Sequence, residues 1–362
     1  MLLNSLSILG FKNIQDTQLQ FSPKINCFIG DNGMGKTNFL DAIYLLSFCK
    51  SHNCFNDTQN IMHDAEFAVI QGYYKRMGEA EEIFCGLKRR QKKQFKRNKK
   101  EYERLSDHIG LIPLVMVSPD DNNLILEGSS ERRKFIDGVI SQYNKTYLQY
   151  LLQYTNILKQ RNALLKHDKP EDAILDIWDE KLCQLGAYIY TERTKFIEDF
   201  IPVFRYFYEK ISGGREKVSL NYSSDHQKHT DLVSNMKMNR SRDKILGYTT
   251  NGIHKDELEM MLGNFPIRQV GSQGQNKTYL IALKFAQFDF LKKIHGISPL
   301  LLLDDIFDKL DTYRVQQIVN LVASDLFGQI FITDTNREHL EQILLPIDDN
   351  SKIFRVENGS IV

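Results

Sequence analysis

The stretch CFIGDNGMGKTNFL, residues 27–40, places three glycines between an apolar run and a helix-like segment. The apolar residues predict the end of a buried strand, and the segment that begins near Thr37 predicts the start of a helix. Between them stands the complete pattern G-x-x-x-x-G-K-[ST], which marks a phosphate-binding loop when it joins a strand to a helix. Glycines let the backbone turn its N–H groups toward an anion, and the following helix adds the positive end of its dipole. The stretch therefore predicts a nucleotide site in an α/β fold.

Each position of this loop has an expected role. Lys36 would reach the β- and γ-phosphates of ATP, and the Thr37 hydroxyl would ligate Mg²⁺. A glycine-rich turn that merely precedes a lysine fits the flanking strand and helix poorly. The expected nucleotide-binding residues are Gly30, Asp31, Asn32, Gly33, Met34, Gly35, Lys36 and Thr37.

The composition sets the class of protein. With 362 residues, 42% hydrophobic and 26% charged, the chain can bury one large core or two lobes. The longest aliphatic run, residues 300–303, is too short to cross a bilayer, and the first residues predict a strand rather than a signal peptide. Five cysteines, an odd number without a CxxC pair, favour reduced thiols. We expect a cytoplasmic protein without membrane contact.

Positive charge is concentrated in one segment. Residues 88–100, KRRQKKQFKRNKK, hold nine Lys or Arg, and removing these nine charges from the net charge of +1 leaves the remainder at −8. Such a cluster is typical of contact with a phosphate backbone. The segment is expected to form a hairpin that turns at Asn98-Lys99, and the alternative to DNA contact is that this hairpin is only solvated. The candidate DNA-binding residues are Lys92, Lys93, Lys96 and Arg97.

A second set of residues completes the predicted nucleotide site. The aliphatic strand PLLLLDD, residues 299–305, ends in Asp304, expected on the metal, and Asp305, expected to polarise the attacking water. Ser272 lies 32 residues before Asp304, in GSQGQNK, ahead of a helix start. This spacing is typical of ABC-class ATPases, whose signature loop closes on the nucleotide of a partner subunit. The expected signature loop is Ser272, Gln273, Gly274 and Gln275, and Asp311 of DKLD is expected in the D-loop.

The order of patterns predicts the architecture. Apolar residues recur at helical spacing between about residues 129 and 210, whereas strand patterns dominate before and after. We therefore expect an α/β P-loop ATPase head with an inserted, mainly helical second lobe. The expected boundaries are 1–117 for the first half of the head, 118–214 for the helical lobe and 215–362 for the second half of the head.

The chain resembles the RecF family, which is related to SMC-type ATPases, and this resemblance implies that the head is an ABC/SMC-type P-loop ATPase head. The resemblance is carried nearly end to end by FKN (11–13), GDNGMGKTNFLDAIYLL (30–46), GSSERRKFID (128–137), IHKDELE (253–259), GSQGQNKTYLIALKFAQ (271–287) and PLLLLDDIFDKLD (299–311). It implies ATP-dependent homodimerisation, binding to single-stranded and duplex DNA near their junctions, slow ATP hydrolysis used as a switch, and RecO and RecR partners in loading recombinase at gapped DNA.

Some positions depart from related ATPases or allow other roles. Asp305 stands where transporters carry the longer Glu, so hydrolysis should be slow. Ser51-His52-Asn53 replaces a frequent Ser-x-Arg, and Thr333 stands in place of a switch histidine. Arg132 and Arg133 could serve as surface ion pairs and His254 as a buried structural histidine. The alternative function is an SMC-like or other P-loop ATPase that does not act on DNA.

Overall fold

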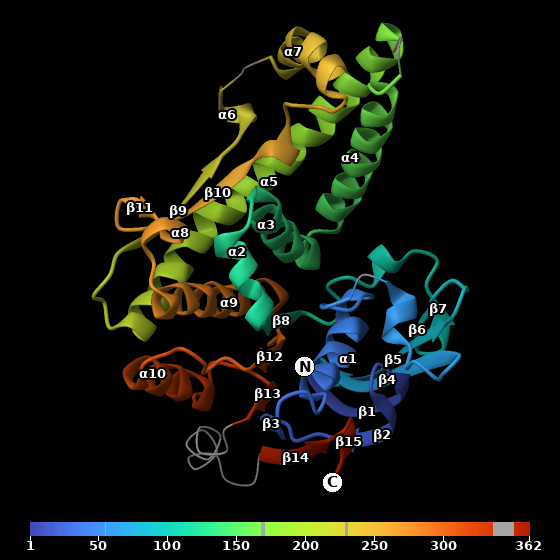
Figure 1. The fold of residues 1–362 in the computed structure, drawn as a ribbon, viewed down its shortest axis with the longest axis vertical. Helices are drawn as coiled ribbons and strands as arrows, with labels where there is room; N and C mark the ends of the chain where they lie inside the picture. The colour runs from blue at the N-terminus through green and yellow to red at the C-terminus, as the bar shows by residue number, and fades with distance from the viewer. Residues whose placement is uncertain (55, 168–170, 229–230, 336–350) are drawn as a thin grey trace. The chain divides into compact units, whose positions relative to one another are not determined.

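The structure, a computed structural model, describes residues 1–54, 56–167, 171–228, 231–335 and 351–362. The chain forms two compact units (Figure 1). Unit 1 contains Met1–Asp121, Lys210–Gly213 and Gln273–Val362, and unit 2 contains Asn122–Glu209 and Gly214–Ser272. Unit 1 therefore collects the two ends of the chain, which carry the predicted loop and the paired acids.

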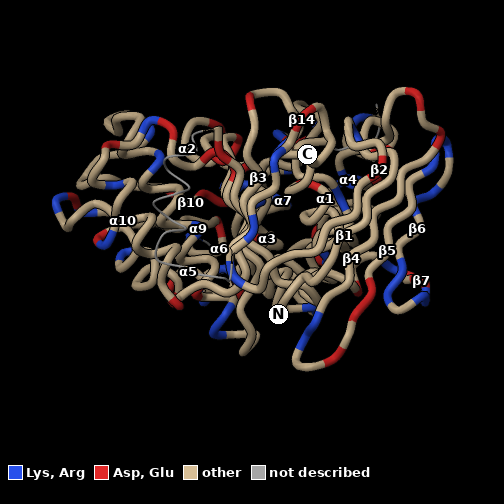
Figure 2. Tube along the Cα trace, turned by 90° about the horizontal axis from the view of Figure 1, so that it is seen from below, with Lys and Arg blue, Asp and Glu red and all other residues tan. Residues whose placement is uncertain are grey.

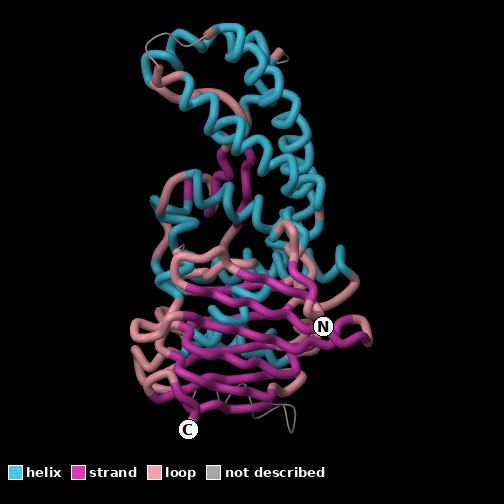
Figure 3. Tube along the Cα trace, turned by 90° about the vertical axis from the view of Figure 1, so that its right-hand side faces the viewer, coloured by secondary structure: helices cyan, strands magenta, loops and turns pink. Residues whose placement is uncertain are grey.

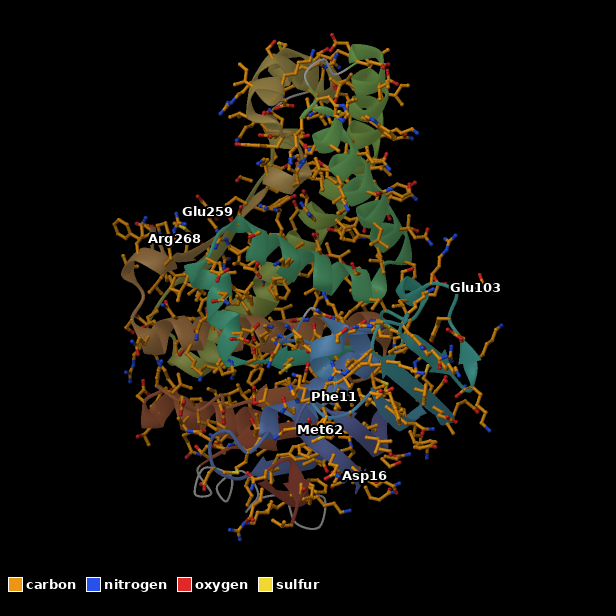
Figure 4. The ribbon with its side chains drawn as sticks, turned by 45° about the vertical axis from the view of Figure 1, so that its right-hand side comes forward. Phe11, Asp16, Met62, Glu103, Glu259 and Arg268 are labelled. Atoms are coloured by element: carbon orange, nitrogen blue, oxygen red, sulfur yellow. The ribbon has the colours of Figure 1, made fainter. Side chains whose placement is uncertain are left out.

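The first sheet of unit 1 is antiparallel, with the strand order β2-β1-β4-β5-β6-β7. Asn98 and Lys99 make the turn between β6 and β7 with φ angles of 49° and 68°, so the predicted hairpin is confirmed. Figure 4 labels Phe11 and Met62. The Met62 N–H donates to the carbonyl oxygen of Gly10, the residue before Phe11, and this bond holds the two segments side by side. The strands are β1 Leu2–Phe11, β2 Ile14–Gln20, β4 Phe67–Arg76, β5 Glu79–Lys88, β6 Gln94–Arg97 and β7 Lys100–Glu101.

The second sheet of unit 1 has the order β15-β14-β3-β13-β12-β8, and all of its pairs are parallel except β14 with β15. Its central strands are almost wholly buried, as expected for a parallel sheet covered on both faces. The carboxyl ends of β3 and β12 thus lie on the same sheet edge with only β13 between them. The strands are β3 Ile25–Ile29, β8 Leu114–Val117, β12 Leu300–Asp304, β13 Ile330–Asp334, β14 Ser351–Glu357 and β15 Ser360–Ile361.

Helix α1, Lys36–Phe48, contacts strands of both sheets. Its apolar residues are buried nearly all round, and Phe39 stacks on Phe28 of β3 with ring centroids 5.1 Å apart. A helix that is buried on all sides is fixed in orientation by packing, so the loop that precedes it is also fixed. Unit 1 also contains α9, Gln273–His295, and α10, Thr312–Ala323, with the 3₁₀ helices Asp57–Asn60 and Leu105–Asp107. A third 3₁₀ helix, Pro119–Asn122, leads from unit 1 into unit 2.

Unit 2 is mainly helical (Figure 3). Buried arginines tie its elements together: Arg161 of α4 pairs with Asp179 of α5 and Asp243 of α7. The helices are α2 Asn123–Leu126, α3 Ser129–Tyr143, α4 Lys145–Leu164, α5 Asp172–Ser212, α6 Asp225–Lys228, α7 Leu232–Leu246 and α8 Ile267–Val270. A small sheet, β11-β10-β9, contains β9 Val218–Ser223, β10 Glu257–Leu262 and β11 Phe265–Pro266. A 3₁₀ turn at Ile253–Lys255 precedes β10.

The expected fold class, a mixed α/β head with a helical insertion, is confirmed. Residues 214–272 pack with the helices of unit 2, because β10 lies against α3, whereas the sequence suggested that the head resumes at residue 215. Gly263 and Asn264 make the turn that joins β10 to β11. Strand patterns alone could not show which of the two units the β9–β10 pair belongs to.

Candidate functional site

The loop between β3 and α1 needs glycine at specific positions. A Cβ on Gly30 would lie 2.4 Å from the Val356 carbonyl oxygen, and a Cβ on Gly35 would lie 2.4 Å from Asn13 Nδ2. Gly35 and Gly33 have φ angles of 98° and 81°, which L-residues rarely adopt. The glycine spacing in the sequence therefore reflects both close backbone approach and left-handed conformation.

Lys36 folds back over this loop. Its ammonium donates to the carbonyl oxygens of Gly30, at 2.8 Å, and Asp31, at 3.0 Å. The side chain is held inside the loop, and the residue is only 5% exposed. A fixed cation at the mouth of a glycine loop can bind the phosphates of a nucleotide.

Thr37, Asp304 and Thr333 form a chain of hydrogen bonds. Thr37 Oγ1 donates to Asp304 Oδ1 at 2.9 Å, and Thr333 Oγ1 donates to the same oxygen at 2.6 Å. Burial raises the pKa of the Asp304 carboxyl, while the hydrogen bonds from Thr333 and Thr37 oppose this shift. The sheet order explains the meeting, because Thr333 is paired with Asp304 between β12 and β13.

These hydroxyl and carboxylate oxygens are the hard ligands that Mg²⁺ prefers. Within the part of the chain that the structure describes, no cluster of three or more His, Cys, Asp or Glu could hold a metal by itself. If Mg²⁺ binds with a nucleotide, Thr37 and Asp304 would hold it together with phosphate oxygens. This donor set fits the ion, and the metal role of both residues stays a prediction.

Asp305, the second acid, has an unusual backbone. Its φ angle is 45°, and its N–H donates to the carbonyl and hydroxyl oxygens of Thr333 at 3.3 and 3.2 Å. Lys277 Nζ donates to the Asp305 carbonyl at 3.0 Å. Burial and the nearby Asp304 charge raise the pKa of the Asp305 carboxyl to about 6. The left-handed conformation costs on the order of 1 kcal/mol, and strain of this kind gathers at functional sites.

The predicted signature loop runs directly into α9, which begins at Gln273. Ser272 and Gln273 are exposed, whereas Gly274 and Gln275 are half-buried. The Gly274 carbonyl accepts a hydrogen bond from Thr278 at 2.8 Å. Ser272 and Gln273 are therefore accessible to another molecule, and their predicted role in a partner's nucleotide site stays a prediction.

Two residues near the loop had no assigned role in the sequence. Asn13 Nδ2 donates to the Met34 carbonyl at 3.3 Å, and Asn38 donates to Asn13 Oδ1 at 2.7 Å, so Asn13 braces the loop. Asp41 of α1 is fully buried and accepts from Lys12, Ser51 Oγ and the His52 N–H. The signal for Asp41 in the sequence is its place as the one acid in the otherwise apolar run of residues 39–46.

Three cations of the basic segment have partners within the fold, although residues 88–100 themselves contain no acid. Lys93 pairs with Asp57 at 2.9 Å, Arg97 Nε donates to Glu81 at 2.8 Å, and Arg89 Nε donates to the Ala65 carbonyl at 2.9 Å. The partners come from other parts of the chain, which no local pattern reveals.

The remaining cations of the basic segment are mostly exposed. Lys96 lies over the ring of Phe84, with its ammonium 5.4 Å from the ring centroid. Figure 2 shows Lys and Arg gathered around β6 and β7 at the edge of the first sheet. Of the four candidate DNA-binding residues, Lys92 is exposed, whereas Lys93, Lys96 and Arg97 are half-buried. The exposed cations are Lys88, Arg90, Lys92, Lys99 and Lys100.

The motif residues of unit 2 hold α3 against the segment that enters β10. Arg132 is buried and pairs with Glu257 at 2.7 Å, and Arg133 donates to the Asp256 carbonyl at 2.7 Å. His254 Nε2 contacts the Thr249 carbonyl at 3.1 Å, and Nδ1 contacts the Tyr154 hydroxyl at 2.8 Å. These contacts give Arg132, Arg133 and His254 structural roles in this unit.

Comparison with known proteins places the chain in a family. Residues 2–362 match the model described as "RecF/RecN/SMC N terminal domain". The "DNA replication and repair protein RecF" of Bacteroides fragilis (strain YCH46) is 60% identical over 363 residues, covering 100% of this chain and 98% of that one. The protein of the same name from Porphyromonas gingivalis is 48% identical and covers 100% of both chains. Among the residues that the structure describes, no helix is long and apolar enough to cross a membrane.

Solved structures agree with this result. The "recombination mediator protein RecF-ATPrS in RecFOR pathway" has a TM-score of 0.88 at 28% identity and covers 99% of this chain and 97% of that one. The corresponding RecF-ATP structure has a TM-score of 0.87 at 29% identity, covering 100% and 98%. An Smc head bound to the C-winged helix domain of ScpA, at 17% identity and TM-score 0.60, shares the fold. The chain belongs to the RecF family, within the wider group of RecF, RecN and SMC proteins.

Proposed function

We propose that this chain is an ATP-controlled recombination mediator that binds DNA. The observation that carries the proposal is the meeting of the phosphate-binding loop with the paired acids through the 2.9 Å hydrogen bond from Thr37 to Asp304. Two relatives in solved structures are described as recombination mediators of the RecFOR pathway with ATP or ATPrS. Membership of their family supports the same role for this chain.

In the proposed nucleotide site, Gly30 to Thr37 hold the phosphates of ATP. Lys36 neutralises the β- and γ-phosphates, and Thr37 with Asp304 ligates Mg²⁺. Asp305 orients the attacking water, and its short side chain makes hydrolysis slow. ATP then acts mainly as a switch.

The proposed switch is a homodimer in which two molecules enclose two ATPs. The exposed Ser272 and Gln273 support this step, because exposed residues are accessible to a second copy. Asp311, which caps α10 and is also exposed, would act as the D-loop residue in the same interface. In this proposal the two molecules associate only when ATP is bound between them.

The proposed partners are DNA, at junctions of single-stranded and duplex regions, and proteins of the RecO and RecR type. The exposed lysines around β6 and β7 support contact with phosphates. The alternative, a P-loop ATPase that does not act on DNA, predicts that neither dimerisation nor hydrolysis responds to DNA.

One experiment tests the nucleotide and dimer steps together. Molar mass is measured by sedimentation with and without ATP, and again with gapped duplex DNA. Wild type should become a dimer with ATP, Lys36→Ala should bind no ATP, and Ser272→Arg should bind ATP but stay monomeric. Ser241→Arg, at an exposed serine of α7, is the matched control and should dimerise normally. An ATP-dependent dimer of Ser272→Arg would contradict the composite site.

A further inference from the structure

The first turn of α10 connects two loops that are far apart in the sequence. Asp311 caps this helix, since its side chain accepts from the Arg314 N–H at 2.9 Å. The Arg314 guanidinium lies 3.3 Å from Asp311 through Nε, and its Nη1 donates to Thr278 Oγ1 of α9 at 3.1 Å. One side chain thus touches the predicted D-loop and the helix that follows the signature loop.

The contact continues into the signature loop itself. Thr278 is fully buried, and its hydroxyl donates to the Gly274 carbonyl while accepting from Arg314. A Cβ at Gly274 would lie 3.5 Å from both Arg314 Nη1 and the Lys309 carbonyl oxygen. The chain Asp311–Arg314–Thr278–Gly274 therefore joins the two loops within one molecule.

This arrangement differs from an ordinary surface ion pair. An exposed pair of residues three positions apart on a helix contributes only a few tenths of a kcal/mol. The Asp311 side chain is 60% exposed, but the Arg314 side chain is only 14% exposed. Arg314 also reaches Thr278, which lies 36 positions away in the sequence. The planar guanidinium has donors in fixed directions, so it can bind both partners at once.

We propose that Arg314 is a positioning residue that couples the D-loop to the signature loop within each subunit. This inference rests on the proposed ATP-dependent dimer, in which both loops would face the partner's nucleotide. A dimer interface forms more readily when its loops are already held in the binding geometry, because less conformational entropy is lost on association. Arg314 would fix that geometry without touching ATP.

A second contact at the same helix start supports the coupling. Lys277, the residue before Thr278, donates to the Asp305 carbonyl at 3.0 Å. Adjacent residues of α9 thus hold the D-loop side and the acid side of the site. A movement of α9 would be transmitted to both.

The test separates ATP binding from dimerisation. Arg314→Gln removes the guanidinium, and Thr278→Val removes the hydroxyl at nearly constant volume. Each variant should weaken the ATP-dependent dimer about tenfold, because one partly buried hydrogen bond is lost, while ATP affinity of the monomer changes less than about twofold. The double variant should dimerise about as weakly as the weaker of the two single variants, because both substitutions remove the same contact.

Two controls guard against a general loss of structure. Thr278→Ser keeps the hydroxyl and should dimerise within about twofold of wild type. Arg242→Gln removes an exposed arginine of α7 and should have no effect. Unchanged dimerisation of Arg314→Gln, or additive effects in the double variant, would overturn the inference alone. A wild-type protein that fails to dimerise with ATP would overturn the dimer proposal and this inference with it.

Discussion

Thr37 and Asp304 stand 267 residues apart in the sequence, yet the Thr37 hydroxyl donates to the Asp304 carboxylate over 2.9 Å. Thr37 lies in the helix that follows β3, and Asp304 ends β12. Only β13 lies between these two strands in the parallel sheet, so both carboxyl ends reach the same edge. Thr333 of the intervening strand β13 also donates its hydroxyl to Asp304 Oδ1, at 2.6 Å. The insertion of unit 2 between the two halves of the sheet leaves this geometry intact.

The first prediction concerns Mg²⁺ at this contact. Asp304→Asn removes the negative charge while keeping the shape, so Mg²⁺ should no longer increase the affinity for ATP. The loss should be at least roughly tenfold, comparable to other losses at metal sites. ATP titrations with Mg²⁺ and with EDTA measure it, and Asp308→Asn, at a nearby exposed acid, is the control. Equal Mg²⁺ dependence in wild type and Asp304→Asn would contradict the metal role.

The sequence predicts those parts of the site whose residues are adjacent along the chain. The loop from Gly30 to Thr37 and the acids that end β12 lie in continuous patterns, and the structure places both where their strands end. Long-range partners were beyond such reasoning. Arg97 pairs with Glu81 because β6 lies beside β5, and sequence spacing does not reveal which strands pair.

The same reason explains why Arg314 was missed. Its partner Thr278 lies 36 residues earlier on another helix. Thr278 falls within the stretch 271–287 that resembles the RecF family, whereas Arg314 lies outside every such stretch, so no motif joins the two. Asn13 was visible only as one letter of a family motif. Its contact with the loop depends on the packing of α1 between two sheets.

The second prediction concerns Asn13 as the brace of the loop. Asn13→Ala removes the donor to the Met34 carbonyl and the acceptor for Asn38, which are 3.3 and 2.7 Å away. Each lost bond should weaken ATP binding by about 1 kcal/mol, so ATP affinity should fall roughly thirtyfold in total, without loss of fold. Calorimetric ATP titration measures this loss of affinity. An unchanged affinity would show that the loop keeps its shape without the Asn13 side chain.

The third prediction uses the pKa of His254. Burial, assisted by the charges of Lys255, Arg133 and Arg161, lowers this pKa from 6.5 to about 4, while the hydrogen bond to the Thr249 carbonyl opposes the shift. Because that carbonyl can only accept, Nε2 carries the proton of the neutral ring and Nδ1 accepts from Tyr154. Protonating His254 therefore requires the Tyr154 hydroxyl to turn away.

The sign of the pH effect follows from this lowered pKa. Between pH 6.5 and about 4 the unfolded chain binds the proton and the folded chain does not, so the free energy of unfolding falls as the pH falls. This one group should account for up to about 2 kcal/mol between about pH 7.5 and 5. Urea unfolding of wild type and His254→Gln at both pH values measures it. The same pH dependence in both proteins would exclude His254 as the source.

The last prediction separates the exposed from the paired cations of the basic segment. Lys92 is exposed, whereas the neighbouring Lys93 has a side chain that is 10% exposed and pairs with Asp57. If the segment contacts DNA, each exposed lysine that neutralises a phosphate adds roughly −0.9 to the slope of log K against log salt. The triple variant of Lys92, Lys99 and Lys100 to Gln should flatten that slope by up to about three units on duplex DNA and weaken binding to all sequences alike.

Lys93→Gln is the matched control, because it removes the same charge at an adjacent position where the ammonium already has a partner. It should lower the free energy of unfolding by about 1 kcal/mol and leave the salt slope nearly unchanged. The measurement is a salt titration of duplex affinity with ATP present, with ATP affinity recorded for each variant. ATP binding should be the same in all of them, since the loop and the paired acids are not altered. Parallel lines for wild type and the triple variant would place the DNA contact on another surface of the protein.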